Sequence, residues 1–348
     1  MKWYGTATMS RSKKKQRTVV NMSFAAGFAA GFAVAKRKFG GGGGDKPEHD
    51  WDYQKWLDLP EPNDNQAVFL IQAADGFLNC YFYIGYNDYD SSITEDGFSI
   101  DWGDGSDTEI FAANIMAISH LYAEPGEYVV TFTHIYKAFG IGKYNTGSAY
   151  ARIIMAKYGR DILIPNNSSG FADCRYLRYV RLSPDVIPSN VSTGFFSRCF
   201  SLKEIEWEGT ITELTQNMFF ACYNLNFDTL NFDINSFDIP SGCFESCFGL
   251  KIQKLPTAKI TSIGYQAFYG CQFTSINLPN CTSIGAQAFS QSRSLKEIIA
   301  PNCTFVDQYA FNTCLVLSKA IFSEECTFGS NCFTYCYGLY PKPDGSIN

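Results

Sequence analysis

Cysteine is the residue type with the greatest capacity for chemistry here, since the 348-residue sequence contains 13 of them. Most recur at fixed places in a repeated motif, where Ser292 and Ile260 replace them in single copies. Exchange with Ser and Ile predicts small buried positions, at which a free thiol behaves as a modest hydrophobe. Disulfides between neighbouring copies stay an alternative, because stacked repeats bring equivalent Cα atoms within bridging distance. The two columns comprise Cys174, Cys199, Cys222, Cys247, Cys271, Cys314 and Cys336, and then Cys281, Cys303 and Cys326.

Metal and catalytic chemistry find little support in the remaining candidate residues. No C-x-x-C pair occurs and no histidine lies in the repeats, so a zinc site is not expected. Asp101, Asp104 and Asp107 follow one another at three-residue steps, which is not the ligand spacing of an EF-hand loop. The pair Asp104-Gly105 predicts a hairpin turn, with calcium binding as the alternative. No catalytic residue, metal or cofactor is predicted, and no nucleophile context surrounds the three histidines, His49, His120 and His134.

The motif F-x-x-C-x-x-L occurs in eight copies between residue 165 and the end, spaced 21 to 25 residues apart. One unit cannot bury its own Phe, Cys and Leu, whereas stacked units bury them as continuous rows. The sequence therefore predicts a solenoid over residues 165–348, with eight rungs that each supply one strand to a parallel sheet running along a whole face. The predicted core positions are Phe171, Cys174, Phe196, Cys199, Phe219, Cys222, Phe244, Cys247, Phe268, Cys271, Phe289, Phe311, Cys314, Phe333 and Cys336.

The later copies extend the pattern to I-T-S-I-G-x-x-A-F-x-x-C-x-x-L-x-x-I-x-x-P, as in the segments 260–268 and 281–289. This pattern resembles the BspA-like leucine-rich repeat. The resemblance implies a binding surface of the kind found in bacterial surface adhesins, and not an enzyme.

A second resemblance lies in residues 51–160, where short β-branched and aromatic runs alternate with Gly, Asp and Asn. Short strands at this spacing predict a β-sandwich. The segments Phe98-Ser-Ile-Asp-Trp-Gly-Asp-Gly105, His120-Leu-Tyr122 and Pro125-Gly-Glu-Tyr-Val-Val-Thr-Phe132 look like those of a PKD domain. That resemblance implies an extracellular spacer or binding module.

The N-terminal segment 1–44 differs in charge from the rest, with nine basic side chains and no acidic one. The remaining residues carry a net charge of −15, so the folded body is not expected to bind nucleic acid. Within the tail, a four-residue period would form an aromatic stripe beside a glycine groove on a helix. The tail is predicted to dock into a larger assembly, with a signal peptide or a membrane anchor as alternatives. The predicted attachment residues are Phe24, Gly27, Phe28, Gly31 and Phe32.

The position directly after the motif cysteine is the candidate ligand-binding stripe, because it is aromatic in four copies: Phe200, Tyr223, Phe248 and Tyr337. If this stripe faces water, its rings could stack on sugars or anchor a protein. The alternative is an outer layer of the core. Because the chain stops nine residues after Leu339, we expect the core of the last rung to be exposed and covered by a partner or a second copy.

These features predict a non-catalytic, oligomeric recognition protein that presents its solenoid to a host protein or glycan. The basic tail favours a phage virion component of the fibre or decoration type. A secreted bacterial cell-surface adhesin and a purely structural assembly protein are the alternatives.

Overall fold

The computed structural model describes residues 56–83, 97–112, 117–134, 152–160, 170–183, 194–207, 209–233 and 238–344. The predicted attachment tail, with its Phe and Gly residues between 24 and 32, lies outside these ranges. Strands and short 3-10 turns are the regular elements of the described residues, which contain no α-helix. No helix in this part of the chain is long and apolar enough to cross a membrane.

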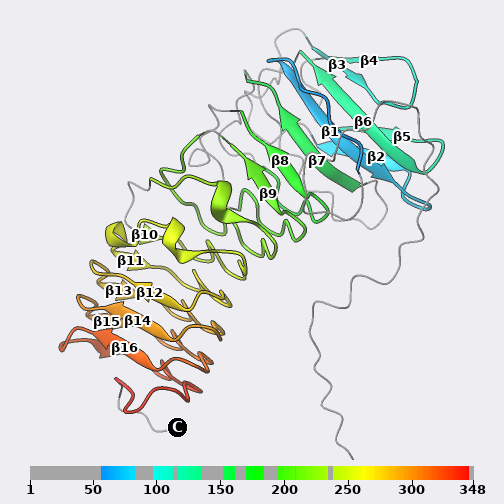
Figure 1. Ribbon diagram of the computed structural model, residues 1–348. Helices are drawn as coiled ribbons and strands as arrows, with labels where there is room; N and C mark the ends of the chain where they lie inside the picture. The colour runs from blue at the N-terminus through cyan, green and yellow to red at the C-terminus, as the bar shows by residue number, and fades with distance from the viewer. Residues whose placement is uncertain are drawn as a thin grey trace, which may run out of the picture. The chain divides into compact units, whose positions relative to one another are not determined.

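The N-terminal part is a two-layered antiparallel β-sandwich (Figure 1). Five strands form one layer in the order β4-β3-β6-β1-β7, and a two-stranded ribbon of β2 and β5 forms the other. Their bounds are β1 Gln66–Ala73, β2 Asn79–Tyr83, β3 Phe98–Asp101, β4 Glu109–Phe111, β5 Ala117–Leu121, β6 Gly126–Thr133 and β7 Arg152–Tyr158.

Aromatic side chains fill the space between the two layers of the sandwich. Phe82 on β2 packs against Phe69 on β1 at 5.1 Å and against Phe132 on β6 at 4.9 Å between ring centroids. All three rings are fully buried. The edge-to-face packing of Phe82 on Phe132 adds to the free energy gained from burial alone.

The large sheet of the sandwich continues directly into the repeats, since β7 pairs in parallel with β8 and β8 with β9. Here β8 is Tyr179–Arg181 and β9 is Glu204–Glu206. A buried lysine marks this junction: Lys157 on β7 donates to Glu61 at 2.9 Å, and the same carboxylate binds Arg181 on β8. The domain ranges 51–160 and 165–348 therefore share one hydrogen-bonded sheet.

Beyond the junction, the chain is a β-solenoid with two rows of short parallel strands (Figure 1). One row has the order β12-β14-β16 and the other β10-β11-β13-β15-β17. The first comprises β12 Ser275–Asn277, β14 Glu297–Ala300 and β16 Lys319–Phe322; the second comprises β10 Asp238–Ile239, β11 Ser262–Ile263, β13 Ser283–Ile284, β15 Phe305–Val306 and β17 Thr327–Phe328. This confirms the β-rich fold with a parallel-sheet solenoid.

The strand row expected along a whole face is interrupted in the middle of the solenoid. The 3-10 turns η2 (Phe227–Thr229), η3 (Ile252–Lys254) and η4 (Thr257–Lys259) lie between β9 and β12. The side chain of Asn226 caps η2 by accepting from the backbone N–H of Asp228, and a local side-chain acceptor of this kind competes with strand pairing. The longer early copies thus replace strand with turn.

The predicted core positions are all buried, and the motif phenylalanines form one unbroken row of stacked rings. Neighbouring centroids lie 5.2 to 5.7 Å apart from Phe171 to Phe333, with planes within 12° of parallel. Each ring therefore packs against its equivalent in the next repeat.

The motif cysteines do more than fill space, because their thiols donate to the motif phenylalanine carbonyl of the preceding repeat. Cys222 donates to Phe196 O at 3.1 Å and Cys247 donates to Phe219 O at 3.0 Å. In the one copy without cysteine, the hydroxyl of Ser292 donates to Phe268 O at 2.9 Å. The exchange of Cys for Ser thus preserves a hydrogen-bond donor at a buried position.

The expectation of an exposed core in the last rung is wrong. Phe333, Cys336 and Leu339 are all buried within the chain itself. The side chain of Lys342 is buried as well, and both Lys342 and Asp344 act electrostatically on the Cys336 thiol. The residues that follow the last motif therefore cover its core.

Candidate functional site

A row of three aromatic side chains, two exposed and one partly exposed, is the candidate binding site of the solenoid. Its members follow the buried motif cysteines in three consecutive repeats: Phe200 after Cys199, Tyr223 after Cys222, and Phe248 after Cys247. Tyr223 is 37% exposed and Phe248 44% exposed, whereas the cysteines before them are fully buried. The chain thus turns each of these rings outward directly after anchoring the preceding residue in the core.

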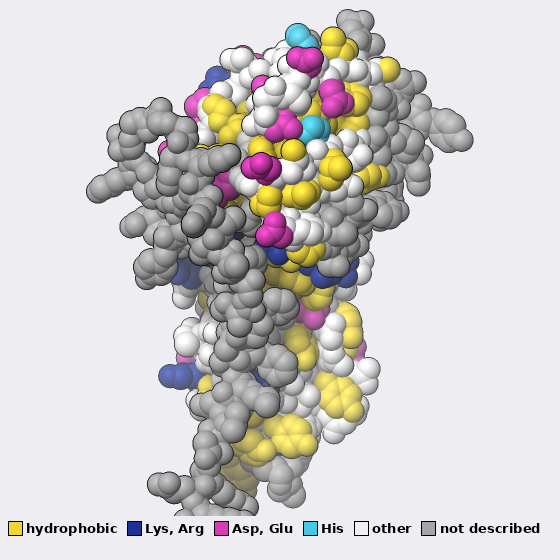
Figure 2. Space-filling model, turned by 90° about the vertical axis from the view of Figure 1, so that its right-hand side faces the viewer, with side chains coloured by type: hydrophobic (Ala, Val, Ile, Leu, Met, Phe, Trp, Pro, Cys, Tyr) yellow, Lys and Arg dark blue, Asp and Glu magenta, His cyan; other side chains and the backbone are white. Residues whose placement is uncertain are grey.

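The three rings stack on one another as the core phenylalanines do. Phe200 and Tyr223 have centroids 5.2 Å apart with planes within 8° of parallel, and Tyr223 and Phe248 are 5.3 Å apart with planes within 14°. We call these three residues the surface row. Hydrophobic side chains gather on the solenoid surface in Figure 2 as well.

The ends of the surface row differ in what lies against them. The guanidinium of Arg175, at the same motif position one repeat earlier, sits 5.6 Å from the centre of the Phe200 ring. At the other end, the equivalent position in the repeat after Phe248 is occupied by an exposed polar residue, Gln272. Within the row, neighbouring rings cover each other's faces, so the row presents ring edges along its length.

The fourth aromatic of the predicted stripe, Tyr337, does not join this row. It is 62% exposed, and its ring lies 6.2 Å from Tyr335 in a tilted arrangement. The intervening copies place Gln272, Arg293 and Leu315 at the equivalent position. The structure therefore brings three of the four predicted residues into contact and leaves Tyr337 apart.

Charged groups lie at one end of the surface row and near its centre. Arg198 binds the buried carboxylate of Asp173 at 2.6 Å, and Arg175 approaches the same carboxylate at 3.7 Å. Farther along, burial raises the pKa of Glu245, and this carboxyl acts electrostatically on Tyr223. Burial, followed by that carboxyl, raises the pKa of the Tyr223 hydroxyl. The row thus has a basic end and, near its centre, an acidic group with a reduced tendency to ionise.

The sequence did not predict the left-handed backbone conformation that directs these rings outward. The residue before the motif cysteine has a positive φ, between 58° and 71°, in all eight copies, and only Gly270 among them is a glycine. A left-handed residue reverses the chain direction within one step. This reversal separates the buried cysteine from the outward residue that follows, but the side-chain types at the position give no signal for it: Asp173, Arg198, Ala221, Ser246, Gly270, Gln291, Thr313 and Tyr335.

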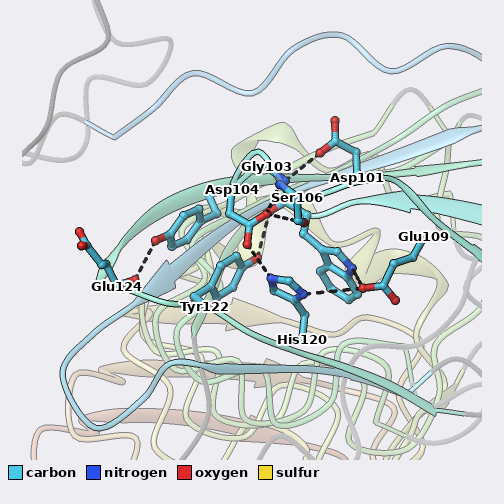
Figure 3. Close-up of polar contacts among 10 residues, drawn as sticks. Asp101, Gly103, Asp104, Ser106, Glu109, His120, Tyr122 and Glu124 are labelled. Carbon is cyan, nitrogen blue, oxygen red and sulfur yellow. Dashed lines mark hydrogen bonds and ion pairs between the residues drawn. The ribbon is translucent and has the colours of Figure 1, made fainter.

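A second cluster of functional groups lies at the β3–β4 turn of the sandwich (Figure 3). His120 on β5 lies 2.8 Å from Asp104 through Nε2 and 3.9 Å from Glu109 through Nδ1. The imidazole also stacks on the buried Trp102 at 4.6 Å, and the Trp102 indole N–H donates to Glu109. The Tyr122 hydroxyl completes the cluster by donating to Trp102 O at 3.3 Å.

The aspartates of this turn are engaged in holding its backbone. Asp101 accepts from Gly103 N, and Asp104 accepts from both N–H and hydroxyl of Ser106. Burial alone would raise the pKa of Asp104, but hydrogen bonds from Ser106 and His120 outweigh it and lower that pKa to about 2. Gly103 is required here, because a Cβ would lie 2.3 Å from the backbone oxygen of Val129.

Across the described residues, no group of three or more His, Cys, Asp or Glu side chains is placed to hold a metal ion. The cluster around His120 fits a structural role in holding the β3–β4 turn, because each of its carboxylates has a hydrogen-bond donor and Trp102, on which His120 stacks, is buried. We therefore take the surface row, and not this cluster, as the candidate binding site.

Parallel strands stacked at the repeat period, with Phe, Cys and Leu in continuous inner rows, define a leucine-rich-repeat solenoid. Residues 164–258 and 220–340 match the family model described as BspA type leucine rich repeat region, in six copies. The chain belongs to the BspA-type leucine-rich repeat family. No curated protein matches the chain.

Several solved structures are similar to this chain. A leucine-rich repeat protein from Bacteroides ovatus ATCC 8483 is 18% identical over 56% of this chain and 54% of its own, with a TM-score of 0.32. The T. pallidum leucine rich repeat protein is 19% identical over 57% of this chain and 88% of its own, with a TM-score of 0.35. A leucine rich cell surface protein from Faecalibacterium prausnitzii A2-165 is 16% identical over 70% and 74%, with a TM-score of 0.32. The chain thus spans about half the length of the first of these.

Proposed function

We propose that the protein is a non-catalytic surface-recognition protein whose solenoid binds a protein on the surface of a bacterial host. The observation that carries this proposal is the surface row, in which Tyr223 and Phe248 are exposed and Phe200 is partly exposed, whereas the motif phenylalanines of the inner row are buried. Aromatic rings held on a rigid scaffold lose little conformational entropy on binding, which makes them effective anchors at interfaces.

The arrangement of the rings favours a protein partner over a glycan. A sugar stacks on an open aromatic face, and the faces within the surface row are occupied by neighbouring rings and by Arg175. Ring edges carry the positive part of the aromatic quadrupole, so they suit apolar side chains, aromatic faces and carbonyl oxygens. A partner segment that lies across the row and places an acidic group near Arg175 or Arg198 would match both features.

The setting we propose is a phage virion, with the basic tail as the attachment to the particle. Its support is the sequence of the tail, in which Phe24, Phe28 and Phe32 alternate with glycines between two groups of basic residues. N-terminal sequencing of the mature protein tests this: an intact Met1 is expected. A mature chain that begins at Lys36 would instead indicate a cleaved signal peptide and a secreted adhesin.

Binding of the full chain to a panel of intact bacteria tests the recognition role. We expect saturable binding that is lost when the cells are treated with protease and retained after periodate oxidation of their glycans. Replacing all three rings of the surface row by serine is expected to weaken binding at least about a hundredfold, since each anchor of this kind contributes about 1–2 kcal/mol or more. Binding that survives protease but not periodate would establish a glycan ligand and overturn the protein partner.

The same triple variant separates recognition from self-assembly. If the surface row were an interface between copies of the chain, the wild-type protein would form oligomers that the triple variant cannot form. Light scattering is expected to give the same particle mass for both proteins. A mass that falls in the variant, with cell binding unchanged, would support a structural assembly role instead.

A further inference from the structure

Three cysteines occupy a column of their own at the C-terminal end of the solenoid, separate from the thiols that donate to the phenylalanine carbonyls. Cys281, Cys303 and Cys326 each stand directly before a threonine in the segment leading to β13, β15 and β17. Cys281 and Cys303 are fully buried, whereas Cys326 is partly exposed. The column therefore has one end that reagents in solution can reach.

The backbone places these cysteines in register on adjacent rungs. Thr327 N donates to Thr304 O and Thr304 N donates to Thr282 O, each at 2.9 Å. Since the cysteines directly precede these threonines, equivalent positions on parallel neighbours are brought to about 5 Å between Cα atoms, within the range of a disulfide. The thiol of Cys303 also interacts directly with the thiols of both Cys281 and Cys326.

Cys326 is the least engaged thiol of the column. Cys281 and Cys303 donate to carbonyls two residues ahead, at 3.2 and 3.3 Å, whereas the contact of Cys326 with a carbonyl, that of Thr327, is longer at 3.8 Å. The rung it belongs to is also the last, because β17 pairs with β15 alone at the edge of its row. A covalent link at this place would hold the edge strand to the rung beneath it.

We propose that Cys303 and Cys326 are a disulfide-forming pair that staples the last rung of the solenoid to the preceding one. A small-molecule disulfide supplies the oxidising equivalents in two exchanges. The Cys326 thiol first loses its proton, and its sulfur attacks the small disulfide to form a mixed disulfide. The leaving thiolate takes up a proton and departs as one small thiol. The Cys303 sulfur then attacks Cys326 and releases the second thiol, so two protein thiols are oxidised and one disulfide is reduced.

The staple forms slowly and is then difficult to reverse. Burial and the neighbouring Cys303 raise the pKa of the Cys326 thiol to about 12, so little of the attacking thiolate is present near neutrality. The resolving thiol of Cys303 is buried, which limits access of outside reductants to the finished bridge. A structural cross-link for an oxidising exterior fits these properties.

Mass spectrometry of the full reduced chain, incubated with excess oxidised glutathione at mildly alkaline pH, tests the proposal. The expected product has lost two hydrogens per chain, retains no glutathione, and contains a link between the peptides bearing Cys303 and Cys326. Backbone amides of β17 are expected to exchange at least about tenfold more slowly once the link is present, because closing a loop of this length removes freedom from the opened state.

Three variants decide which sulfurs react. Cys326→Ser is expected to remain free of any link, and Cys303→Ser is expected to stop at a glutathione adduct on Cys326. Cys336→Ser is the matched control, because a serine hydroxyl makes the same carbonyl hydrogen bond in the Ser292 copy; it should form the link as the wild type does. A link that persists in Cys326→Ser, a bridge between Cys281 and Cys303 in the wild type, or a fully reduced wild-type chain would each overturn the proposal.

Discussion

The solenoid carries two rows of stacked aromatic rings, and they differ in length. The inner row runs without interruption through eight repeats from Phe171 to Phe333. The surface row has nearly the same ring spacing but extends over three repeats only, from Phe200 to Phe248. Because the repeat geometry is shared by both rows, the shorter one is not needed to build the fold.

This difference separates what the fold requires from what it permits. Each inner ring between the two ends of the row is covered on both faces by its neighbours, so removing one leaves a cavity that the backbone cannot close. Removing a ring of the surface row exposes its neighbours to solvent and leaves no enclosed cavity. The outward position accepts Gln272, Arg293 and Leu315 in other repeats without a change of fold, so the fold does not require an aromatic residue there.

The largest expected effect is on the inner row. Phe244→Ala removes a ring stacked between Phe219 and Phe268 and is expected to lower the free energy of unfolding by about 3–5 kcal/mol. The matched surface variant, Phe248→Ala, is expected to cost no more than about 1 kcal/mol. Denaturant unfolding of both variants measures the contrast, and equal losses would remove the distinction between the two rows.

A smaller effect is expected at the thiols that support the inner row. Cys247→Ala removes one of two donors to the Phe219 carbonyl, which still accepts from the backbone N–H of Cys222, and is expected to cost about 1–1.5 kcal/mol. Cys247→Ser keeps a donor, as Ser292 does, and is expected to lose less than half as much. The same unfolding measurement applies, and a serine variant as unstable as the alanine variant would show that size, not hydrogen bonding, fixes this position.

In the sandwich, the hydrogen bonds of Asp104 in the β3–β4 turn are not repeated as the contacts of the solenoid rows are. The lowered pKa of Asp104 stabilises the folded state at any pH above the unfolded value of about 4, and that stabilisation disappears as the pH falls to about 2. Asp104→Asn is therefore expected to lower the free energy of unfolding by about 1 kcal/mol at pH 7, since solvent screens this partly exposed group. The difference from wild type should vanish between pH 4 and pH 2; a difference independent of pH would assign the effect to the turn geometry.

The solenoid could be predicted from sequence because its signal is repeated eight times, and each copy names the same inward residues. The exchange of cysteine for Ser292 even pointed to the buried column, although the hydrogen bond it preserves depends on the carbonyl of Phe268 in another repeat. The 3-10 turn near Asn226 was not predictable, because the Asn226 side chain caps it locally in one of the longer copies. The separation of Tyr337 from the surface row follows from the order of the repeats, since Gln272, Arg293 and Leu315 occupy the copies between Phe248 and Tyr337.

The surface row is tested most directly by two single tyrosine variants in the same cell-binding assay. Tyr223→Ala removes the central ring of the row, and Tyr337→Ala removes a more exposed tyrosine outside it. We predict that Tyr223→Ala weakens binding at least about tenfold, in line with the loss of one anchor residue, and that Tyr337→Ala binds as the wild type does. Equal binding by Tyr223→Ala and wild type, with both chains folded, would contradict the assignment of the row as the recognition surface.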